Sequence, residues 1–318
     1  MAKKKDPHAQ RQTKQRLWIA RTAAWSGLDV AAVKQLLLTP RTQSVRVNPL
    51  IEGDIAPALL QQPISWCPHG YHVVVGSEGD YDALAQSGRI YIQNAASWLP
   101  VLALEPHPDE RILDMCAAPG GKSSHIQAMA QNRAHLVCND NSRPRLMKLR
   151  ANLERLGARA EFSLADATRL SRRDDSGLFD KILLDAPCSG EGLMTLRPED
   201  AALFDSWSVA HIRRLSDLQK KLITEAWRLL RPGGTLVYST CTMAPEENEA
   251  VVDYLLRRQP DAQLLPLNLP VLPNRVPVVT RWNGRTFTHD LSAYLRLVPG
   301  ELTEAFFVAA LRKDPSIR

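Results

Sequence analysis

Long apolar stretches, paired cysteines and clustered histidines are all missing from this sequence of 318 residues. Without a run of about 18 apolar residues, a membrane-spanning helix is excluded. The five cysteines form no C-x-x-C pair, which argues against both a disulfide framework and a zinc site. The polar, basic start lacks the apolar segment of a secretory signal peptide. We therefore expect a cytoplasmic protein with free thiols, no bound metal and no membrane partner.

The net positive charge is concentrated in the first residues of an otherwise ordinary globular composition. Hydrophobic residues make up 44% of the chain and charged residues 23%, as in folded domains. The formal net charge is +6, and residues 1–16 hold six basic residues against one acidic residue. A flexible basic arm of this kind suits contact with the phosphates of a nucleic acid. A solvated terminus that only aids solubility explains the same charges.

Residues 17–98 have the pattern of a small α+β region. Apolar residues at helical spacing over 17–38 predict two short helices that are broken near Gly27. Asp29 is the expected N-cap of the second helix. The alternating stretch 44–50 predicts a strand, and glycines and prolines separate the short apolar segments that follow it.

After about residue 99, strands and helices alternate along the chain. This pattern builds a parallel sheet that is covered on both faces, so we predict an α/β fold over residues 99–318. In such sheets, ligands bind beyond the carboxyl ends of the strands. The predicted strands are 111–116, 135–140, 161–166, 181–187, 235–241 and 305–311. One predicted helix begins at Lys122, and the others span 143–156, 211–230 and 245–257.

The first predicted strand ends in a turn that is rich in small residues. Asp114 is followed by Met-Cys-Ala-Ala-Pro-Gly-Gly-Lys, and small residues at such a turn let a ligand approach the backbone closely. The G-x-G-x-x-G fingerprint is absent, and a phosphate loop would need glycine in place of Cys116. A pyrophosphate or triphosphate ligand is therefore disfavoured.

Acidic residues end the next two predicted strands. Asp140 stands 20 residues after Gly120, which is the spacing of a residue that accepts hydrogen bonds from ribose hydroxyls. Asp166 ends the third strand and is placed to meet an adenine amino group. A ribose and an adenine without a pyrophosphate indicate S-adenosylmethionine. Two aspartates that only cap their loops are the alternative.

Two cysteines stand at the ends of the fourth and fifth predicted strands. Cys188 follows the fourth strand and Cys241 ends the fifth. Because neighbouring parallel strands end side by side, both thiols should face one cleft. A helix that begins at Pro245 would favour the thiolate form of Cys241, and a thiolate can attack an electron-poor ring carbon. Cys116 and Cys138 are interpreted as small buried side chains.

Several segments carry a family resemblance. LDMCAAPGGKSSHI, Asn139-Asp140, LLDAPCSGEG and YSTCTMAPEEN together resemble the Nol/Nop/Sun family of RNA cytosine 5-methyltransferases, of the bacterial ribosomal RNA type. The match covers about residues 90–257. SVRVNPL and YIQNAASWLP also resemble the N-terminal region of this family. The final strand departs from the family, because Glu304-Ala305 stands where Asp-Gly is common.

The resemblance implies a Rossmann-like class I methyltransferase domain with S-adenosylmethionine as the cofactor. Asp140 is expected to hold the ribose, Asp166 the adenine edge, and Asp185 to border both the cofactor and the target base. Cys241 resembles the nucleophile that adds to carbon 6 of cytosine, so that carbon 5 can take the methyl group. Cys188 resembles the residue that helps the methylated base to leave. The methionine end of the cofactor is expected to lie against Cys116, Ala117, Ala118, Pro119, Gly120, Gly121 and Lys122.

Two further residues are expected to assist the chemistry at the ring. Asp185 can donate a hydrogen bond to the ring if it is protonated, or orient the exocyclic amine if it is not. Lys122 adds positive potential beside it. The base that removes the proton from carbon 5 is not identified by the sequence.

The N-terminal region, residues 17–98, is expected to recognise RNA. Arg46 and Asn48 are candidates for holding the RNA that flanks the target base. Core packing is the preferred interpretation of Trp18 and Trp25. The expected partner is ribosomal RNA or transfer RNA, with ribosomal RNA preferred, and the expected state is a monomer.

Two other functions are compatible with parts of this pattern. A DNA cytosine 5-methyltransferase would use the cysteine of the Pro187-Cys188 pair as its nucleophile, but it would leave Cys241 without a role. A non-catalytic RNA-binding assembly factor could share the fold, but it would need neither thiol. A comparison of activity on RNA and on DNA tests the DNA methyltransferase. The absence of cofactor binding would indicate the non-catalytic factor.

Overall fold

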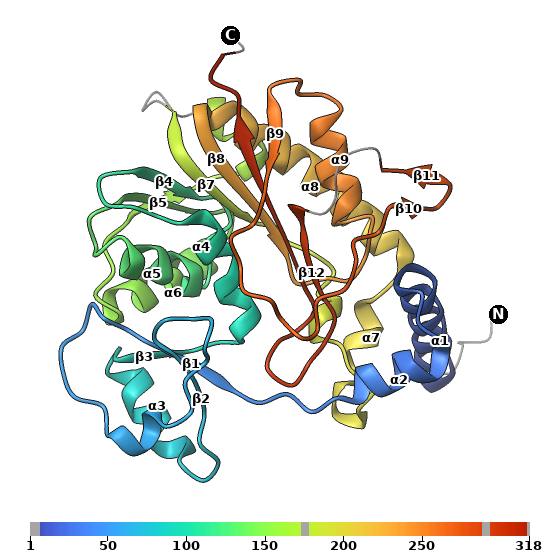
Figure 1. Ribbon diagram of the computed structural model, residues 1–318, viewed down its shortest axis with the longest axis horizontal. Helices are drawn as coiled ribbons and strands as arrows, with labels where there is room; N and C mark the ends of the chain where they lie inside the picture. The colour runs from blue at the N-terminus through green and yellow to red at the C-terminus, as the bar shows by residue number, and fades with distance from the viewer. Residues whose placement is uncertain (1–6, 173–177, 288–292, 317–318) are drawn as a thin grey trace.

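The computed structural model describes residues 7–172, 178–287 and 293–316. In this part of the chain, an eight-stranded sheet has helices on both faces, and a three-stranded sheet lies beside it (Figure 1). No described helix has both the length and the apolar character needed to cross a membrane. The helices are α1 (Pro7–Ser26), α2 (Val30–Leu38), α3 (Glu78–Gln86), α4 (Leu99–Leu104), α5 (Gly121–Met129), α6 (Arg143–Arg155), α7 (Leu203–Ser206), α8 (Val209–Leu229) and α9 (Glu249–Leu256). The strands are β1 (Ser44–Val47), β2 (Gly70–His72), β3 (Ile90–Ile92), β4 (Arg111–Asp114), β5 (His135–Asp140), β6 (Glu161–Leu164), β7 (Phe179–Asp185), β8 (Leu230–Thr240), β9 (Ala262–Leu265), β10 (Arg281–Trp282), β11 (Arg285–Thr286), β12 (Leu295–Leu297) and β13 (Phe306–Lys313).

The large sheet is parallel over most of its width and antiparallel at one edge. Its strand order is β12-β13-β8-β7-β4-β5-β6, and β9 pairs with β13. β4, β5, β6, β7 and β8 run parallel, as the alternation of strands and helices predicts. The strands β9, β12 and β13 pair antiparallel, so the parallel pairing that the alternation predicts is confined to the five central strands. The short connection between β12 and β13 cannot supply the crossover that a parallel pair requires.

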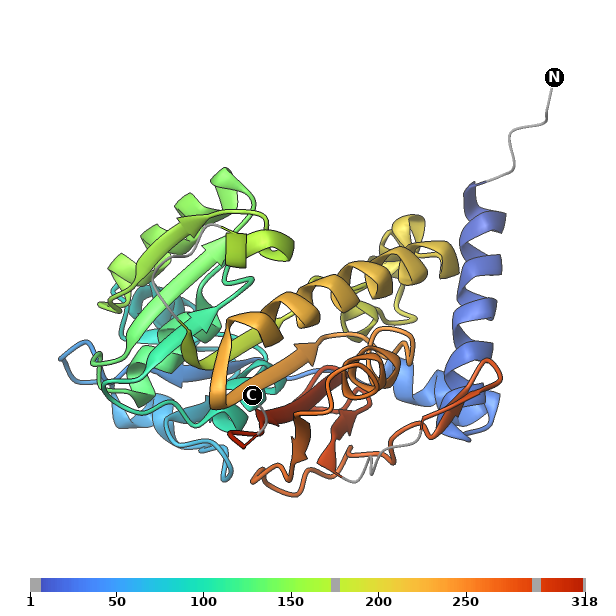
Figure 2. The same cartoon turned by 90° about the horizontal axis from the view of Figure 1, so that it is seen from above.

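Successive side chains of each central strand enter two different apolar cores. In β4, Leu113 packs with α8 and α9, whereas its neighbour Ile112 packs with α4, α5 and α6. In β7, Ile182 and Leu183 divide between the two cores in the same way. These four side chains are at most 1% exposed. Both faces of the sheet are therefore covered, and Figure 2 shows α8 along one of them.

The parallel strands end at one edge of the sheet. β5 ends at Asp140, β7 at Asp185 and β8 at Thr240, so the segments that follow them emerge side by side. β6 ends at Leu164, earlier than predicted, because the side chain of Asp166 already caps the next turn. The predicted Rossmann-like arrangement, with helices on both faces, is confirmed.

Arg46 and Asn48 lie inside the protein rather than on an open surface. The side chain of Arg46 is 1% exposed, and its Nη2 donates to Ser124 Oγ of α5 at 2.8 Å. Asn48 is 3% exposed and donates to the carbonyls of Gly88 and Leu156 at 2.8 and 2.9 Å. Both side chains join the three-stranded sheet, β2-β1-β3, to the helices of the large domain. The prediction that they hold flanking RNA as surface contacts is therefore wrong.

The expected flexible basic arm, residues 1–16, is helical from Pro7 onward and forms half of α1. The guanidinium of Arg11 pairs with the carboxylate of Asp205 in α7 at 2.5 Å. The ammonium of Lys14 donates to the backbone carbonyl of the same aspartate at 2.6 Å. These contacts fix the helix against α7, so the prediction of a flexible arm is wrong for its described part. The earlier residues of the arm lie outside the described residues.

The first two helices pack by the residues that the sequence indicated. Trp18 is 1% exposed, and its ring meets Phe204 edge to face at 5.2 Å between centroids. Trp25 is half-buried, with the guanidinium of Arg296 lying 4.6 Å from its ring centroid. Core packing is thus confirmed for Trp18, and Trp25 forms part of the same interior. Asp29 caps α2 as predicted, by accepting a hydrogen bond from the backbone of the helix.

Candidate active site

A cavity of about 400 Å³ lies at the carboxyl ends of the parallel strands. It brings together both thiols of the predicted strand ends and the three aspartates that were assigned to the cofactor. Apolar side chains from α8 and from the turn after β4 complete its wall. The residues that line it include Met115, Cys116, Ala118, Asn139, Asp140, Asp166, Asp185, Cys188, Leu218, Leu222 and Cys241.

The Cys-Ala-Ala-Pro-Gly-Gly-Lys turn contributes a smaller part of this wall than predicted. Cys116 and Ala118 line the cavity. Ala117 is 6% exposed and belongs to the apolar core beneath the turn. The carbonyl of Pro119 accepts a hydrogen bond from Asn152 of α6 at 2.8 Å. The structure therefore divides this segment between the cavity and the packing that supports it.

The two glycines of the turn allow close packing against neighbouring elements. Gly120 has a φ of +105°, and a Cβ placed on it would lie 2.8 Å from the Leu149 side chain. A Cβ on Gly121 would lie 2.7 Å from the ring of Tyr91 in β3. Larger residues would push α5 away from α6 and from the three-stranded sheet.

The aspartates that follow β5 and β6 both cap turns while they border the cavity. Asp140 is 3% exposed, accepts from the Ser142 amide at 2.9 Å and pairs with Arg145 at 3.3 Å. Asp166 is largely exposed and accepts from both the amide and the hydroxyl of Thr168. These hydrogen bonds lower the pKa of Asp166. A carboxylate has about four lone-pair sites, so each keeps acceptor capacity for a ligand in the cavity.

An ion pair connects the turn after β4 to the end of β7. Lys122 Nζ lies 2.8 Å from Asp185 Oδ2, and Asp185 Oδ1 accepts from Ser239 Oγ at 2.7 Å. The ammonium also lies 5.6 Å from the ring centroid of Phe306. Burial by itself lowers the pKa of Lys122, but the attraction of Asp185 and then Cys241 outweighs it and the net pKa is raised. Lys122 is therefore a fixed cation beside the thiols.

Two other groups beside the turn are buried. Asp114 is 1% exposed and accepts from Ser123 Oγ at 2.7 Å, and burial raises its pKa to about 7. Cys138 is fully buried, as predicted for a small core side chain, whereas Cys116 is half-buried in the cavity wall. Burial raises the pKa of both thiols, so both are protonated at neutral pH.

Cys188 and Cys241 face each other with 3.3 Å between their Sγ atoms, as predicted from the adjacent strand ends. The hydrogen bond between the two sulfurs and then burial raise the pKa of Cys188 well above its ordinary value. Cys188 therefore keeps its proton and can donate to the sulfur of Cys241. The predicted helix start at Pro245 is wrong, because α9 begins at Glu249. The positive charge that acts on Cys241 comes from Lys122 rather than from a helix N-terminus.

Glu247 links the loops that carry the two thiols, and the sequence did not reveal it. Its side chain accepts from the amide of Ser189 at 3.0 Å, from the hydroxyl of Ser189, and from Gln219 Nε2 at 2.9 Å. It also accepts a longer hydrogen bond from the Thr242 hydroxyl at 3.4 Å. The residue is fully buried, and this burial raises its pKa to about 7. The segment Pro-Glu-Glu-Asn was the available signal, but it was interpreted as the first turn of a helix.

The neighbouring Asn248 explains why α9 begins late. Its Nδ2 donates to the carbonyl of Thr242 at 3.0 Å, and its Oδ1 accepts from the hydroxyl of Thr240 at 2.5 Å. These two hydrogen bonds tie the side chain of Asn248 to the end of β8 and to the loop that follows it. Local helix propensity is therefore overridden until Glu249.

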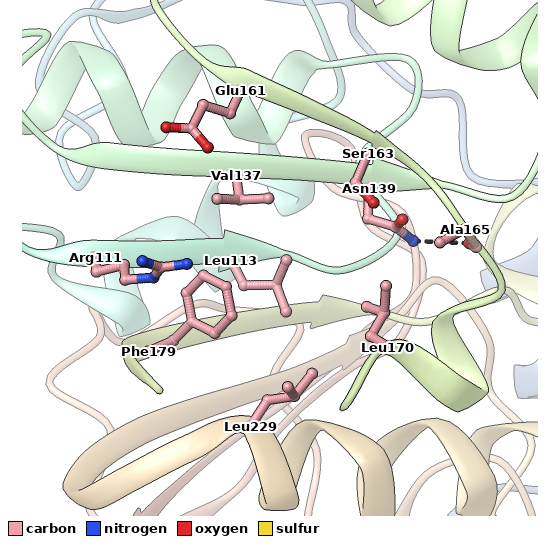
Figure 3. A pocket seen from close by; sticks show the side chains of 10 residues that line it. All are labelled: Arg111, Leu113, Val137, Asn139, Glu161, Ser163, Ala165, Leu170, Phe179 and Leu229. Carbon is pink, nitrogen blue, oxygen red and sulfur yellow. Dashed lines mark hydrogen bonds between the residues drawn. The ribbon is translucent and has the colours of Figure 1, made fainter. Parts of the chain in front are cut away.

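A separate cavity of about 180 Å³ lies on the face of the sheet that is turned toward α8 (Figure 3). The guanidinium of Arg111 lies 4.7 Å from the ring centroid of Phe179 there. Asn139 Nδ2 donates to the carbonyl of Ala165 at 3.2 Å, and Asn139 lines both cavities. None of the predicted site residues lines this second space, which separates it from the chemistry at the strand ends.

Comparisons with known proteins agree with this geometry. The family model described as 16S rRNA methyltransferase RsmB/F matches residues 101–312. The chain belongs to this family. The tRNA (cytosine(49)-C(5))-methyltransferase of Pyrococcus abyssi is 38% identical over 87% of this chain and 90% of its own length. The Ribosomal RNA small subunit methyltransferase F of Erwinia tasmaniensis is 37% identical over 87% of this chain, which spans only 58% of that protein.

A solved structure extends the likeness to the fold. The methyltransferase homolog protein from Pyrococcus horikoshii is 28% identical, with a TM-score of 0.72, over 93% of this chain and 99% of its own. Membership of the RsmB/F family confirms the predicted family, the enzyme class and S-adenosylmethionine as the methyl donor.

The cavity at the strand ends fits that donor. Acceptor side chains at the ends of β5 and β6 suit ribose hydroxyls and an adenine amine, and apolar Met115, Leu218 and Leu222 suit the faces of a base. The buried Oδ1 of Asn139 has no hydrogen-bond partner among the described residues, and it lines the same space. Within the described part of the chain, no three His, Cys, Asp or Glu side chains are arranged to hold a metal ion.

Proposed function

We propose that this chain methylates carbon 5 of a cytosine in RNA through a covalent bond between Cys241 and the base. The observation that carries the proposal is the pair of thiols 3.3 Å apart, beside the Lys122–Asp185 ion pair and on the wall of the cofactor cavity. Cytosine is weakly nucleophilic at carbon 5, and addition of a thiolate to carbon 6 makes carbon 5 electron-rich.

Cys241 is the proposed nucleophile because a cation and a hydrogen-bond donor are its neighbours. The ammonium of Lys122 interacts electrostatically with Cys241. Cys188 is a protonated thiol that can donate a hydrogen bond to the sulfur of Cys241. Attack would form the sulfur–carbon 6 bond at the expense of the carbon 5–carbon 6 π bond. Carbon 5 would then take the methyl group as the methyl–sulfonium bond breaks, which leaves S-adenosylhomocysteine.

Asp185 is proposed to orient the target base. Its carboxylate is held from two sides, by Lys122 and by the hydroxyl of Ser239. A fixed acceptor at this position can hold the exocyclic amine of cytosine, and the ammonium of Lys122 stabilises charge that develops on the ring. The base must be unpaired or flipped out to reach it.

The cofactor, when bound, supplies an electrophilic methyl group on a sulfonium. Asp140 and Asp166 are proposed to hold its ribose and adenine, with Cys116 and Ala118 beside its methionine end. Asp185 lines the same cavity as both thiols and is paired with Lys122, so this pair would hold the base next to the donor. A base, which could be a water molecule, would take the carbon 5 proton. The electrons of that bond would re-form the carbon 5–carbon 6 double bond and expel Cys241 as a thiolate, and Cys188 is proposed to aid this release.

The RNA itself is proposed to be ribosomal, with transfer RNA as the second substrate class to test. The family description names 16S rRNA, whereas the archaeal relative is named for tRNA. Residues 17–98 are proposed to contact the RNA, and a monomer in the cytoplasm stays our expectation.

The experiment is a denaturing gel of two variants, Cys241→Ala and Cys188→Ala, each incubated with RNA and S-adenosylmethionine. We expect Cys188→Ala to attack, transfer the methyl group and stall, which leaves a protein–RNA adduct. Cys241→Ala should bind RNA and the cofactor but should neither methylate nor crosslink. Cys67→Ala, at a buried thiol outside the site, is the matched control and should retain turnover.

The opposite result would overturn this assignment. An adduct in Cys241→Ala and none in Cys188→Ala would make Cys188 the nucleophile, as in DNA cytosine methyltransferases. Activity on DNA in place of RNA would contradict the substrate class. A folded protein that fails to bind S-adenosylhomocysteine in calorimetry would instead indicate a non-catalytic RNA-binding factor.

A further inference from the structure

Cys188 and Cys241 are each followed by a residue that carries a hydroxyl group. Ser189 follows Cys188, and Thr242 follows Cys241. The two sulfurs lie 3.3 Å apart, and the two hydroxyl oxygens lie 2.8 Å apart. The two loops therefore meet twice, once through the thiols and once through Ser189 and Thr242, which form a hydroxyl pair.

The carboxylate of Glu247 holds the hydroxyl pair in place. Its Oε2 accepts from the backbone amide of Ser189 at 3.0 Å, and its Oε1 accepts from the hydroxyl of the same residue. Because Ser189 gives its only hydroxyl hydrogen to this carboxylate, Thr242 donates in the 2.8 Å contact between the two hydroxyls. The amide of Ala244 in turn donates to Thr242 Oγ1 at 3.3 Å. Both hydroxyl groups therefore have fixed orientations.

The hydroxyl pair stays connected when Glu247 takes up a proton. Oε2 accepts from two N–H groups, those of Ser189 and Gln219, so the proton can lie only on Oε1. Oε1 then donates to Ser189, Ser189 donates to Thr242, and Thr242 donates to Glu191 Oε2 at 3.3 Å. The hydrogen bonds of the Ser189 hydroxyl reverse their direction, whereas the contacts themselves remain. The arrangement thus tolerates either charge state of Glu247, whose pKa is about 7.

A buried side chain of α8 completes the support of the two loops. Gln219 Nε2 donates to Glu247 Oε2 and to the carbonyl of Pro187, at 2.9 Å each. Pro187 directly precedes Cys188. Glu247 and Gln219 are 0% exposed, and Thr242 is 1% exposed. Water cannot replace lost hydrogen bonds at such buried positions, so each bond restricts the two loops.

We infer that Glu247 and the hydroxyl pair are positioning residues, which set the separation between the sulfurs of Cys188 and Cys241. This inference rests on the proposed function, in which Cys188 donates to the sulfur of the nucleophile. None of the three is among the described residues that line the cofactor cavity, so they act through the thiols rather than on the base. Each hydroxyl residue is the direct neighbour of its cysteine, so a change in the contact between the hydroxyls moves one sulfur relative to the other.

The first test compares two replacements of Thr242. Thr242→Val keeps the shape of the side chain but removes the hydroxyl, whereas Thr242→Ser keeps the hydroxyl. We expect Thr242→Val to lower kcat on RNA by about threefold to tenfold, as for the loss of one buried hydrogen bond, and Thr242→Ser to restore most of it. KM for RNA and the affinity for S-adenosylhomocysteine should change by less than about twofold, since the residue lies outside the cavity. Thr224→Val, which removes a hydroxyl that bonds within α8, is the matched control and should keep its kcat.

The second test reports on the sulfur separation without RNA or cofactor. Phenylarsine oxide bridges two neighbouring thiols: arsenic forms a bond to each sulfur, and its oxygen leaves as water with both thiol protons. We expect the wild type, Thr242→Ser and Thr224→Val to bind one arsenical between Cys188 and Cys241, which peptide mapping by mass spectrometry identifies. Thr242→Val should bind it about threefold to tenfold more weakly, and Cys188→Ala should lose the bridge.

Ser189→Ala covers the case in which Thr242→Val does not fold, because it removes the other hydroxyl and should give the same two losses. Unchanged arsenical affinity or unchanged kcat in the folded variants would overturn the positioning role, as would a loss of activity that Thr242→Ser shares. A wild type that binds the arsenical but methylates no RNA would instead contradict the proposed function.

Discussion

Lys122 and Asp185 form an ion pair across two strand ends, with 2.8 Å between Nζ and Oδ2. Lys122 belongs to the first turn of α5 and Asp185 is the last residue of β7. The pair therefore fixes the distance between the turn that borders the proposed cofactor site and the loop that carries Cys188. The ammonium of Lys122 also interacts electrostatically with Cys241, so the pair supplies a cation to this thiol.

Replacing Lys122 by methionine should remove this cation while keeping most of the side-chain volume. We expect kcat to fall by about 10²-fold or more, because the thiolate of Cys241 and the developing charge on the ring lose their positive partner. The measurement is steady-state methylation at saturating RNA and cofactor. Lys148→Met, on the exposed side of α6, is the matched control and should keep its activity. A kcat within about threefold of the wild type would exclude a role for Lys122 in the chemistry.

Asp140→Ala should weaken cofactor binding by about 1–3 kcal/mol, since a ribose hydroxyl would lose its acceptor. Calorimetric titration with S-adenosylhomocysteine measures the change. Asp140→Asn separates this role from turn capping, because asparagine keeps an oxygen for the Ser142 amide. An intermediate loss is expected for the asparagine variant. Unchanged affinity in a folded Asp140→Ala protein would remove this residue from the cofactor site.

Glu247 should make stability depend on pH. Its pKa is about 7 in the folded protein, against 4.5 for an ordinary glutamate, so the folded protein retains a proton that the unfolded chain releases. The contribution of this group to stability is full below about pH 4.5 and is lost as the pH rises through about 7. Glu247→Gln imitates the protonated acid and cannot ionise.

The difference in unfolding free energy between Glu247→Gln and the wild type should therefore change with pH. We expect it to shift by about 2–3 kcal/mol in favour of the variant between pH 4.5 and pH 8. Urea unfolding of both proteins at each pH measures it, and the other buried acids, Asp114 among them, are common to both proteins. A constant difference across this range would show that Glu247 is ionised in the folded state throughout.

The ion pairs of this protein should differ widely in their effect on stability. Arg296 and Glu249 are both at most 1% exposed and meet at 2.5 Å, so Arg296→Met leaves a buried carboxylate without its partner. We expect a loss of about 3–5 kcal/mol in urea unfolding. Arg11 and Asp205 are partly exposed, so Arg11→Ala should cost far less stability than Arg296→Met. Equal losses in the two variants would contradict this reasoning.

Much of the candidate site followed from the sequence because it depends on strand order. Asp140, Asp185 and Cys241 follow strands of strong apolar pattern, and such strands pair in parallel when helices separate them. Side-by-side ends then bring distant residues together, as the contact between Cys188 and Cys241 shows. The close approach of these thiols is a consequence of topology, which an alternating pattern predicts well.

The remaining features depend on tertiary contacts that no local pattern contains. The basic segment around Arg11 is helical because α7 meets it, although its own residues are polar. Asn248 delays the start of α9 by bonding to the loop after β8. Arg46 and Glu247 carry charges that usually lie on surfaces, so their burial was unexpected. Charged residues enclosed by distant segments are the part of such a site that sequence reasoning misses.

The packing of the first two helices has a consequence for biosynthesis. Trp18 and Val33 complete their apolar cluster with Phe204, Ile212 and Ala305, which lie far along the chain. A ribosome adds about 5–20 residues per second, so these helices leave it roughly ten seconds to one minute before their partners exist. During that interval their apolar faces are open to chaperones or to neighbouring nascent chains. The first two helices therefore reach their final structure only after the residues around Ala305 have been made.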